Sequence, residues 1–579
     1  MKITIAKTAG FCMGVRRAVD MVLDAANTET GTICTFGPLI HNPQVLAMLK
    51  EKGIPYITRI PDKAQGTVLI RAHGVPPQSR KALEDAGFHV IDATCPRVTR
   101  VQSIIEKHAK KGFHTIIIGD HDHPEVKGLM GYARERAHTV SSMDDLAALP
   151  IFARAVVVAQ TTQDTLFYKK IKSWASENCP QYKIFDTICD STEKRQAEVR
   201  KIAGENDAVI VVGGRESGNT RRLAEIAHET AEYSLHIEDP AEIEDHHIKA
   251  LSQADSIAVT AGASTPNWII NRTFRTLEDN LLTKSSNPFT LPARKIRDFL
   301  LKTNLLLAFG AASLTYTCSR LQNIENIFIH SIIAMLYILS MQIMNNLFAI
   351  PSDRYNNPGR ALFYGRHKVW LALTAIASGA AGIYLSFSTS ILSFVIIVIM
   401  SLLGLLYNQK LFKATFRGRK ISRIKDIPGS KTVLIALAWG TVSSLLPLLS
   451  TWGPESLSLA FAVSFTFTTA ILFARTAFFA LMDIQGDRIS GKETLPILLG
   501  EKKSERLISR TLLFAALLMA TAPFFNIVPY GTIFMAFIPL SMLYVVKAHE
   551  KRKIYSGMNL EFIMESQFLI SGLIALVFL

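Results

Sequence analysis

The apolar positions of the first 280 residues fall in short continuous runs that alternate with amphipathic stretches of helical period. Examples of these runs are residues 68–70 (VLI), 115–118 (TIII) and 209–212 (VIVV). Such β-branched runs predict strands. Because the runs are continuous rather than alternating, both faces of each strand should be buried, as in parallel sheets covered by helices. The pattern therefore predicts an α/β fold for residues 1–280.

The pattern changes after residue 280. Residues 281–298 (LLTKSSNPFTLPARKIRD) contain serines, an asparagine, two prolines and scattered basic residues, which together predict a linker. The chain then shows about nine apolar segments, and most could supply the roughly 20 helical residues that cross a hydrocarbon core. They lie near 299–318, 327–350, 369–387, 390–407, 432–450, 458–481, 511–526, 529–546 and 561–579. Burial in a soluble core could explain one or two of them but not nine, so residues 299–579 are predicted to form an all-α polytopic membrane domain.

Basic residues concentrate in alternate loops of this membrane half. If residues 1–280 are cytoplasmic, the inside loops are 351–368, 408–431, 482–510 and 547–560, and the outside loops carry almost no Lys or Arg. This distribution is what the positive-inside rule requires. We therefore expect a multi-pass protein of the inner (cytoplasmic) membrane, surrounded by lipid, with its N-terminal half in the cytoplasm. The start of the chain, MKITIAKTAGFC, lacks the apolar core and cleavage site of a signal peptide.

Composition narrows the partners only a little. Six cysteines in 579 residues do not form a disulfide framework. The net charge of +15 suits anionic phosphates or an anionic membrane face as well as nucleic acid. The chain shows neither an aromatic-interleaved basic patch nor a nucleic-acid motif, so no nucleic-acid partner is expected.

Three of the cysteines share one kind of position. Cys12, Cys95 and Cys189 each follow a predicted strand and precede a helix, at separations of 83 (95 − 12) and 94 (189 − 95) residues. One thiol per structural repeat could aim three sulfurs at a central point. Three thiolates there would hold a metal or a cluster with one position open for chemistry. The other cysteines lack this context and are expected to be packed thiols.

Polar motifs also recur at the predicted strand ends. They are HNP at 41–43, RAHG at 71–74, DHDHPE at 120–125, QTTQ at 160–163, SGNT at 217–220 and TAGAS at 260–264. The carboxyl ends of strands form the ligand site of α/β folds, and helix N-termini favour anions. Taken singly, a histidine after a strand is commonly a surface or hydrogen-bonding residue, and a Ser-Gly-Asn-Thr run is commonly an N-cap. Their recurrence at equivalent positions favours a shared anion site.

Together these motifs resemble the 4-hydroxy-3-methylbut-2-enyl diphosphate reductase family, which catalyses the last step of the methylerythritol phosphate isoprenoid pathway. The resemblance rests on GFCMGVRRAV, the histidine motifs, DATCPRV, HPE, QTT, the Cys189 segment, SGNT and TAGAS, and it covers essentially all of residues 1–280. It implies a three-lobed, pseudo-threefold α/β fold around a central [4Fe–4S] cluster. Cys12, Cys95 and Cys189 would bind three irons, and the fourth iron would remain free for the substrate hydroxyl.

The same resemblance implies a reaction and a set of roles. An allylic hydroxyl is removed with two electrons and two protons, giving isopentenyl and dimethylallyl diphosphates. The electrons would come from a low-potential donor of the ferredoxin or flavodoxin type. Glu125 would donate a proton, and Thr161 would position the hydroxyl and relay that proton. The substrate-binding residues would be His41, His73, His123, Thr161, Ser217, Asn219 and Ser264.

A zinc site is the alternative explanation of the cysteines. Three thiolates and one histidine could complete a tetrahedron around Zn2+. Structural zinc ligands usually come in close pairs such as C-x2-C, and this chain has no such pair.

The membrane half carries a motif of its own. Asp483 and Asp487 lie four residues apart on one helix face and could share a Mg2+ ion that binds a diphosphate. This segment, Arg475 and the loop from 407 to 431 resemble the UbiA-type intramembrane prenyltransferases, whose nine-helix architecture also fits. The first metal motif departs from that family, because Asn345 and Asp353 flank an alanine, Ala349, where a carboxylate is usual.

Two alternatives therefore stay open for the membrane half. It is either an active prenyltransferase, with Mg2+ at Asn345, Asp353, Asp483 and Asp487, or a degenerate or repurposed membrane anchor. For the whole chain the primary hypothesis is a membrane-tethered reductase. The competing one is a membrane prenyltransferase with a regulatory reductase-like head, and the complete head motifs argue against it.

Overall fold

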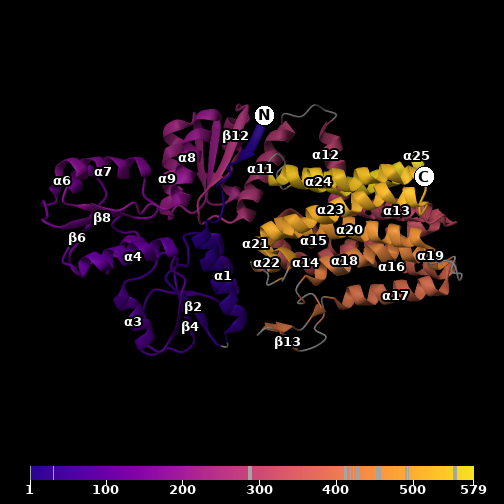
Figure 1. Ribbon diagram of the computed structural model, residues 1–579, viewed down its shortest axis with the longest axis horizontal. Coiled ribbons are helices and arrows are strands. Elements are labelled where there is room, and N and C mark those ends of the chain that lie inside the picture. The colour runs from indigo at the N-terminus through magenta and orange to yellow at the C-terminus, as the bar shows by residue number, and fades with distance from the viewer. Residues whose placement is uncertain are drawn as a thin grey trace. The chain divides into compact units, whose positions relative to one another are not determined.

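The chain divides into two compact units, Met1–Ser285 and Ser286–Leu579 (Figure 1). The structure is a computed structural model. It describes residues 2–29, 31–284, 290–407, 409, 414–416, 419–421, 423–424, 427, 429–450, 458–489, 492, 494–551 and 557–579. Much of the loop 408–431, and Gly491 beside the second aspartate motif, lie outside the described residues.

The N-terminal unit contains three four-stranded sheets, and every strand pair in them is parallel. The first lobe has β2 (Ile33–Phe36), β3 (Tyr56–Ile57), β4 (Thr67–Ile70) and β5 (His89–Asp92), in the order β3-β2-β4-β5. The second has β6 (His114–Ile118), β7 (Ala137–Val140), β8 (Ala155–Ala159) and β9 (Lys183–Ile184), in the order β7-β6-β8-β9. The third has β10 (Ala208–Val212), β11 (Tyr233–Ile237), β12 (Ser256–Ala261) and β1 (Lys2–Ile5), in the order β11-β10-β12-β1.

The three lobes therefore share one topology. In each lobe the first strand along the chain pairs with the second on one side and the third on the other, and the fourth strand forms the far edge. The third lobe differs only in taking its fourth strand, β1, from the beginning of the chain. Figure 1 shows the lobes set around a common centre. This arrangement agrees with the expected three-lobed α/β fold.

Helices connect and cover the strands of the N-terminal unit. They are α1 (Met13–Thr28), α2 (Pro43–Glu51), α3 (Pro77–Asp85), α4 (Pro96–Ala109), α5 (Pro124–Met130), α6 (Met143–Ala148), α7 (Thr165–Asn178), α8 (Asp190–Glu205), α9 (Gly218–Thr230), α10 (Asp245–Leu251) and α11 (Asn267–Lys284). Every residue of the inner strands β4, β8 and β10 is buried. The continuous apolar runs thus predicted the burial of both sheet faces correctly.

The C-terminal unit is almost entirely helical. Its helices are α12 (Thr290–Lys302), α13 (Leu305–Leu321), α14 (Ile327–Asn356), α15 (Pro358–Arg366), α16 (Lys368–Thr389), α17 (Ile391–Leu406), α18 (Ser430–Gly440), α19 (Leu446–Ser450), α20 (Leu459–Met482), α21 (Ile484–Ile489), α22 (Leu495–Leu499), α23 (Glu501–Thr521), α24 (Phe537–Glu550) and α25 (Met558–Phe578). A π-helical turn at Thr441–Leu445 joins α18 to α19, and β13 (Ala414–Phe416) pairs with β14 (Arg419–Ile421).

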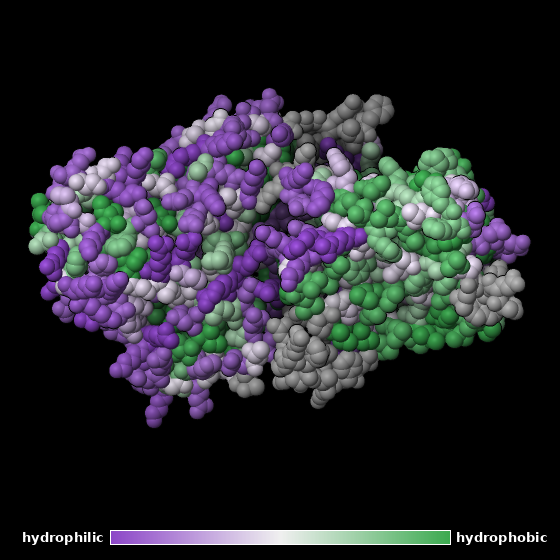
Figure 2. Space-filling model, viewed as in Figure 1, coloured by the Kyte–Doolittle hydropathy of each residue, from purple (hydrophilic) through white to green (hydrophobic). Residues whose placement is uncertain are grey.

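Seven helical segments among the described residues are long and apolar enough to cross a membrane, and the bent pair α12–α13 would make eight. The remaining expected segment, 390–407, is α17, which is apolar but only 16 residues long. Large apolar side chains such as Trp370 (74 % exposed) and Tyr384 (71 % exposed) face outward from this unit. Figure 2 shows its surface as mainly hydrophobic, whereas the surface of the N-terminal unit is mainly hydrophilic. This outward apolar surface is what a lipid-embedded bundle requires.

The expected linker at 281–298 is helical over most of its described residues. α11 extends to Lys284, and α12 begins at Thr290 and bends by 74° into α13. The prolines and serines suggested an irregular segment. Pro292, however, lies in the first turn of α12, where a missing N–H costs no intrahelical hydrogen bond.

Candidate active site

The polar residues predicted from the sequence occupy equivalent places in the three lobes. The first strands of the three lobes are β2, β6 and β10. His41 follows β2, His123 and Glu125 follow β6, and Ser217 and Asn219 follow β10. Third strands lead to His73, Thr161 and Ser264, and fourth strands lead to Cys95, Cys189 and Cys12. The structure brings all eleven of these residues into the lining of one pocket. Parallel strands within each lobe direct their carboxyl ends to one side, and the three lobes turn those sides toward each other.

The three cysteines occupy one structural role. Each is the N-cap residue of a helix: Cys12 of α1, Cys95 of α4 and Cys189 of α8. The Val15 N–H donates to Cys12 Sγ at 3.4 Å. A Cβ atom at Gly14 would clash with Cys95 Sγ, so the first turn of α1 lies directly against the second cysteine. Glycine is therefore required at position 14 for the thiols to converge.

The cysteines fit a group that is larger than a single metal ion. Among the described residues, only His41, His73 and His123 form a set of three or more potential ligands whose atoms all lie within 4.8 Å of one another. The three sulfurs are therefore spread more widely. Zn–S bonds of about 2.3 Å would hold tetrahedral sulfurs about 3.8 Å apart, so this spacing does not fit the zinc alternative. It suits a cluster with three thiolate ligands.

The electrostatics of the thiols also call for a cationic centre. Burial raises the pKa values of Cys95 and Cys189, and the neighbouring thiol of Cys12 raises both further. Backbone N–H groups at the start of α4 and α8 act in the opposite direction. The raised pKa values favour neutral thiols in the empty site, and a cation held between the three sulfurs would stabilise the thiolate forms.

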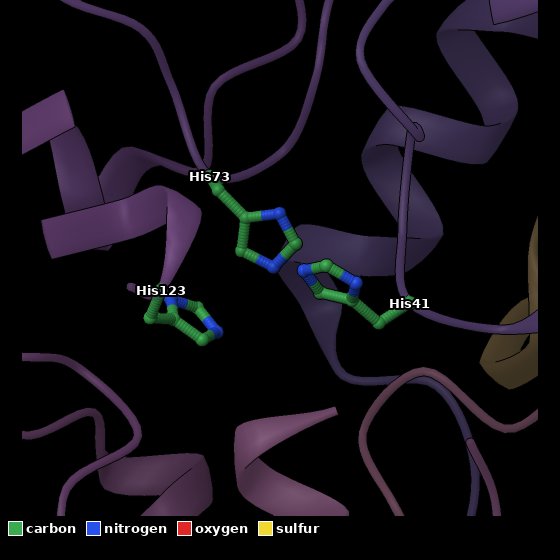
Figure 3. Close-up of side chains that lie close together, drawn as sticks. All are labelled: His41, His73 and His123. Atoms are coloured by element: carbon green, nitrogen blue, oxygen red, sulfur yellow. The ribbon is translucent and has the colours of Figure 1, made fainter. Parts of the chain in front are cut away.

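Three histidine rings lie close together in the pocket lining that also contains the cysteines, and Figure 3 shows these rings. The ring centroids lie 4.7 Å (His41–His73), 5.6 Å (His41–His123) and 5.4 Å (His73–His123) apart. Burial lowers the pKa of each, to about 3 for His123 and well below the ordinary value for His73. Their mutual proximity lowers the pKa values of His73 and His123 further. Near neutral pH the three rings are therefore uncharged in the empty site.

The hydrogen bonding of His123 favours an anion over a metal at these rings. His123 Nδ1 accepts the N–H of Glu125 at 3.1 Å as the N-cap of α5. A neutral imidazole carries one N–H, so the proton sits on Nε2, which becomes a donor rather than a metal ligand. In the described structure, His41 Nε2 and His73 Nδ1 are buried without a hydrogen-bond partner. Such a set of ring nitrogens matches a ligand with several oxygen atoms.

Glu125 and Thr161 form a buried hydrogen-bonded pair in the lining of the same pocket. Thr161 donates its N–H to Glu125 Oε1 at 2.7 Å and its hydroxyl to Oε2 at 2.9 Å. Burial raises the pKa of Glu125 to about 7, although both Thr161 donors and the charge of Arg222 act to lower it. The carboxyl is thus close to half protonated at neutral pH, which suits a proton donor.

The remaining lining residues offer neutral polar groups. Ser217 caps α9 by accepting the Thr220 N–H at 3.4 Å, and Ser264 donates to the His41 carbonyl at 3.0 Å. Both polar atoms of the Asn219 amide are buried without a hydrogen-bond partner in the described structure. An unpartnered buried amide is costly, so a polar ligand is expected to complete it.

The membrane unit places Asp353, Asp483 and Asp487 near enough to influence one another's ionisation. Asp353 lies in the last turn of α14, Asp483 caps α20 and Asp487 lies on α21. Burial raises the pKa of Asp483, and the adjacent Asp487 raises it further. Burial likewise raises the pKa of Asp353 against the opposing charge of Lys492. Asp487 Oδ1 accepts the Asn356 amide at 3.0 Å and lies 3.5 Å from Lys492 Nζ.

The assignment of Asn345 to a metal site stays a prediction, and Arg475 has an ion-pair partner in the helix bundle. Asn345 forms no hydrogen bond to the three aspartates among the described residues. Arg475, one of the residues that carry the resemblance to the UbiA-type family, donates to Glu565, with Nε 3.0 Å from Oε1. The charge of Arg475 is thus matched within the helix bundle.

Comparisons with known proteins show the families of the two units. The family model described as LytB protein matches residues 3–278. A 4-hydroxy-3-methylbut-2-enyl diphosphate reductase of Trichlorobacter lovleyi is 40 % identical over 278 residues, which is 48 % of this chain and 98 % of the relative. The chain belongs to the 4-hydroxy-3-methylbut-2-enyl diphosphate reductase family. A reductase of Alkaliphilus oremlandii is also 40 % identical, covering 47 % of this chain and 97 % of the relative.

The reductase unit is fused to a second family domain. The model of the UbiA prenyltransferase family matches residues 305–563. The structure of a UbiA homolog from Aeropyrum pernix K1 is 14 % identical and covers 46 % of this chain and 96 % of that chain, with a TM-score of 0.37. The chain is therefore an oxidoreductase of isoprenoid biosynthesis, of an iron–sulfur enzyme family, joined to a UbiA prenyltransferase domain.

Sequence reasoning missed several residues of the reductase site. Arg97, Ser191 and Thr192 line the pocket, and all three follow a cluster cysteine within three positions. That proximity was a usable signal. Arg222, which donates to Gln163 Oε1 at 3.0 Å and to Asp120 Oδ1 at 2.8 Å, is buried behind Glu125 and had no local signal.

Sequence reasoning also missed the ion pairs of the UbiA domain. Arg360 pairs with Glu561, and Arg475 pairs with Glu565, both on α25. Here a signal existed, because Glu565 stands inside an apolar span. An ionisable residue in such a span points to a partner on a neighbouring helix.

Proposed function

We propose that the N-terminal unit reductively removes the hydroxyl of 4-hydroxy-3-methylbut-2-enyl diphosphate, with Cys12, Cys95 and Cys189 holding a [4Fe–4S] cluster. The observation that carries this proposal is the convergence of three cysteine-capped helices on a pocket that also holds the Glu125–Thr161 pair and three neutral histidines. When bound, the cluster supplies electrons and a Lewis-acidic iron for the departing oxygen.

The histidine side of the pocket binds the diphosphate in this proposal. His123 Nε2 presents an N–H, and His41, His73 and Asn219 have buried polar atoms without partners. Diphosphate oxygens can accept from the amide and from each ring that carries a proton toward them. Ser217 and Ser264, whose hydroxyls are 3.4 Å apart, add further donors. The anion would be recognised chiefly by groups that are neutral in its absence.

In this proposal Glu125 and Thr161 supply the proton for the departing hydroxyl. Glu125 is nearly inaccessible to water, at 1 % exposed, and holds a proton at Oε1 or Oε2 below about pH 7. Thr161 Oγ1 lies 2.9 Å from Oε2, so it can orient the substrate hydroxyl while passing a proton from Glu125 toward it. Loss of that hydroxyl as water requires a proton at this place.

Cys95→Ser tests the assignment. The full-length chain, purified anaerobically in detergent, should be brown and absorb near 400 nm, and it should convert the substrate with a low-potential donor of the ferredoxin or flavodoxin type. Cys95→Ser should leave the N-terminal unit folded, with a damaged cluster and essentially no turnover. Cys179→Ser, which alters a thiol of the second lobe's core, is the matched control and should keep the cluster. Full activity of Cys95→Ser would refute the assignment.

We propose in addition that the UbiA domain crosses the inner membrane with its aspartates on the cytoplasmic side. The excess of Lys and Arg in the loops 351–368, 408–431, 482–510 and 547–560 supports this orientation. This orientation would place the reductase unit on the cytoplasmic side, together with Asp353, Asp483 and Asp487. The diphosphate substrate of the reductase and a prenyl diphosphate for the UbiA domain would then be bound from the same side.

A second candidate function is prenyl transfer by the UbiA domain. The proximity of Asp353, Asp483 and Asp487, which is close enough for the charge of Asp487 to act on the other two, favours it, because neighbouring carboxylates can share Mg2+ and, through it, a diphosphate. Membranes containing the full chain should be given a labelled prenyl diphosphate, Mg2+ and candidate acceptors. Transfer that disappears in Asp487→Asn would establish the activity. No transfer by the unmodified chain, but transfer by Ala349→Asp, would identify a degenerate site.

A further inference from the structure

Arg195 is a buried guanidinium that joins two of the cysteine loops. It lies on α8, six residues after Cys189, and is 3 % exposed. Nη1 donates to the Ala261 carbonyl at 3.0 Å, Nη2 to the Gly10 carbonyl at 2.6 Å, and Nε to Ser191 Oγ at 3.3 Å. Gly10 is two residues before Cys12, and Ser191 is two residues after Cys189. One side chain thus ties both loops to the end of β12.

All three of these acceptors are neutral. Among the described residues, no carboxylate forms an ion pair with Arg195. The charged groups that act on it most are, in order, Cys12, Glu198 and Cys189. Glu198 is already engaged, because its carboxylate accepts the N–H groups of Lys7 at 2.6 Å and Thr8 at 2.7 Å.

A buried cation without an adjacent anion is costly. The cysteine thiolates are the negative groups that remain to balance Arg195. The fold therefore places a fixed positive charge near the cysteines. The negative charge that balances it would come from the thiolates together with the group that they bind.

We propose that Arg195 is the counter-charge of the cluster and makes that cluster easier to reduce. This inference rests on the cluster assignment proposed above. Reduction adds one negative charge to the cluster, and a nearby fixed cation in a poorly solvated site stabilises the more negative state. Arginine stays protonated under all relevant conditions, so the effect is permanent. Arg195 touches no substrate and acts as a positioning and tuning residue.

The test is an electron paramagnetic resonance titration of the cluster's midpoint potential in the full-length chain. Arg195→Gln removes the charge but keeps polar atoms for the carbonyls. Its equilibrium constant for one-electron reduction should fall about tenfold, which corresponds to about 59 mV. Arg195→Lys keeps the charge and should stay within about threefold of the unmodified chain.

Arg200→Gln is the matched control. Arg200 lies on the same helix, five residues further along, and its guanidinium pairs with Asp164 at 2.9 Å. Its removal should leave the potential unchanged, because its charge is neutralised away from the cysteines. A fall in Arg195→Gln alone would support the inference.

Other outcomes are equally decisive. Equal potentials for the unmodified chain, Arg195→Gln and Arg195→Lys, with the cluster retained in each, would make Arg195 purely structural and overturn the inference. If Arg195→Gln does not retain the cluster, Glu198→Gln decides: removing that opposing negative charge must raise the potential, and no change or a fall overturns it. A chain that assembles no four-iron cluster refutes the cluster assignment, and this inference with it.

Discussion

Glu125 is a buried carboxyl whose ionisation state is set by competing neighbours. Burial raises its pKa to about 7, while two hydrogen bonds from Thr161 and the positive charge of Arg222 act in the other direction. A carboxyl with this pKa carries its proton in about half of the molecules near neutral pH, as a proton donor requires. Turnover should therefore decline as the pH rises through about 7, because the protonated fraction is lost.

Glu125→Gln separates the catalytic effect of this carboxyl from its effect on stability. The variant should keep the cluster spectrum and lose most turnover. Because the folded pKa lies above the ordinary value of 4.5, folding favours the protonated form, and this contribution to stability is lost as the pH rises from about 4.5 to about 7. The cost above pH 7 is about 3 kcal/mol. The difference between the thermal midpoints of the variant and the parent should therefore shift in favour of the variant from pH 5 to pH 8. An unchanged turnover of the variant would remove Glu125 from the mechanism.

The three histidines predict proton uptake on ligand binding. Burial holds their pKa values below the ordinary range, so the empty site is uncharged near neutral pH. A bound diphosphate favours the protonated rings and raises these pKa values, so affinity should increase as the pH falls from 8 to 6. Titration calorimetry with inorganic diphosphate in buffers of different ionisation enthalpy measures the protons taken up. Binding without proton uptake, and independent of pH, would place the anion elsewhere.

At this scale the sequence predicted the residues that follow strands and missed those that reach the site from a distance. Cys12, Glu125 and Thr161 could be found because each stands at a strand end or in the first turn of the next helix. Arg195 and Arg222 could not, because each acts through a long side chain from the second turn of its helix. Most of their partners, such as the Gly10 and Ala261 carbonyls and the side chains of Asp120 and Gln163, are distant in sequence, and no local pattern reports them.

At the scale of elements, the reductase unit is one strand order used three times. The sequence predicted parallel strands because the inner runs are continuously apolar, and it predicted strand-end sites because the motifs follow those runs. It did not predict that β1 completes the third sheet, since that pairing joins residues 2–5 to residues 256–259. Local periodicity carries no record of such a distant pairing.

Gly14→Ala tests the close approach of α1 to the second cysteine. A methyl group at position 14 would clash with Cys95 Sγ and Cβ, so α1 or Cys95 must move. We expect lower cluster occupancy, measured as iron per chain and absorbance near 400 nm. Gly204→Ala is the control, because a Cβ atom there meets nothing within 4 Å, and it should retain full occupancy. Normal iron content in Gly14→Ala would show that the helix can shift without cost.

The Arg475–Glu565 pair links α20 to α25 inside the UbiA domain. The two side chains are only 14 % and 3 % exposed. Arg475→Leu leaves a buried carboxylate without its partner and should destabilise the domain by about 3–5 kcal/mol. The double variant Arg475→Leu/Glu565→Leu removes both charges and should recover most of that loss. Thermal unfolding in detergent measures both, and equal losses in the single and double variants would argue against the pair.

At the scale of the whole molecule, the chain joins two units with different solvents. The hydrophilic surface of one and the apolar surface of the other were both readable from composition. The two units meet at Ser285 and Ser286, inside the segment 281–298 that the sequence predicted as a linker, and residues 290–298 of that segment belong to α12. Of the expected spans, only 390–407 is a short helix, since its apolar run ends where polar residues begin at 408.

The proposed orientation predicts which face a protease can reach. In inverted membrane vesicles the reductase unit should be digested and the UbiA domain largely protected, because the basic loops place the N-terminal unit on the cytoplasmic face. Immunoblotting for each unit measures the result. Right-side-out vesicles supply the control, where the reductase unit should survive. Digestion of the reductase unit in right-side-out vesicles but not in inverted ones would indicate the opposite orientation.

The position of β1 in the third sheet has a consequence for biosynthesis. Its partner β12 is made 251 residues later (256 − 5), which takes about 13–50 s at 5–20 residues per second. During that interval β1 and the Cys12 loop have no sheet to join, although the first two lobes can already form. With the proposed cluster ligands, iron could therefore be captured by all three cysteines only when the last strand has left the ribosome. By then the first apolar helix follows closely behind, so metallation and membrane insertion overlap in time on one nascent chain.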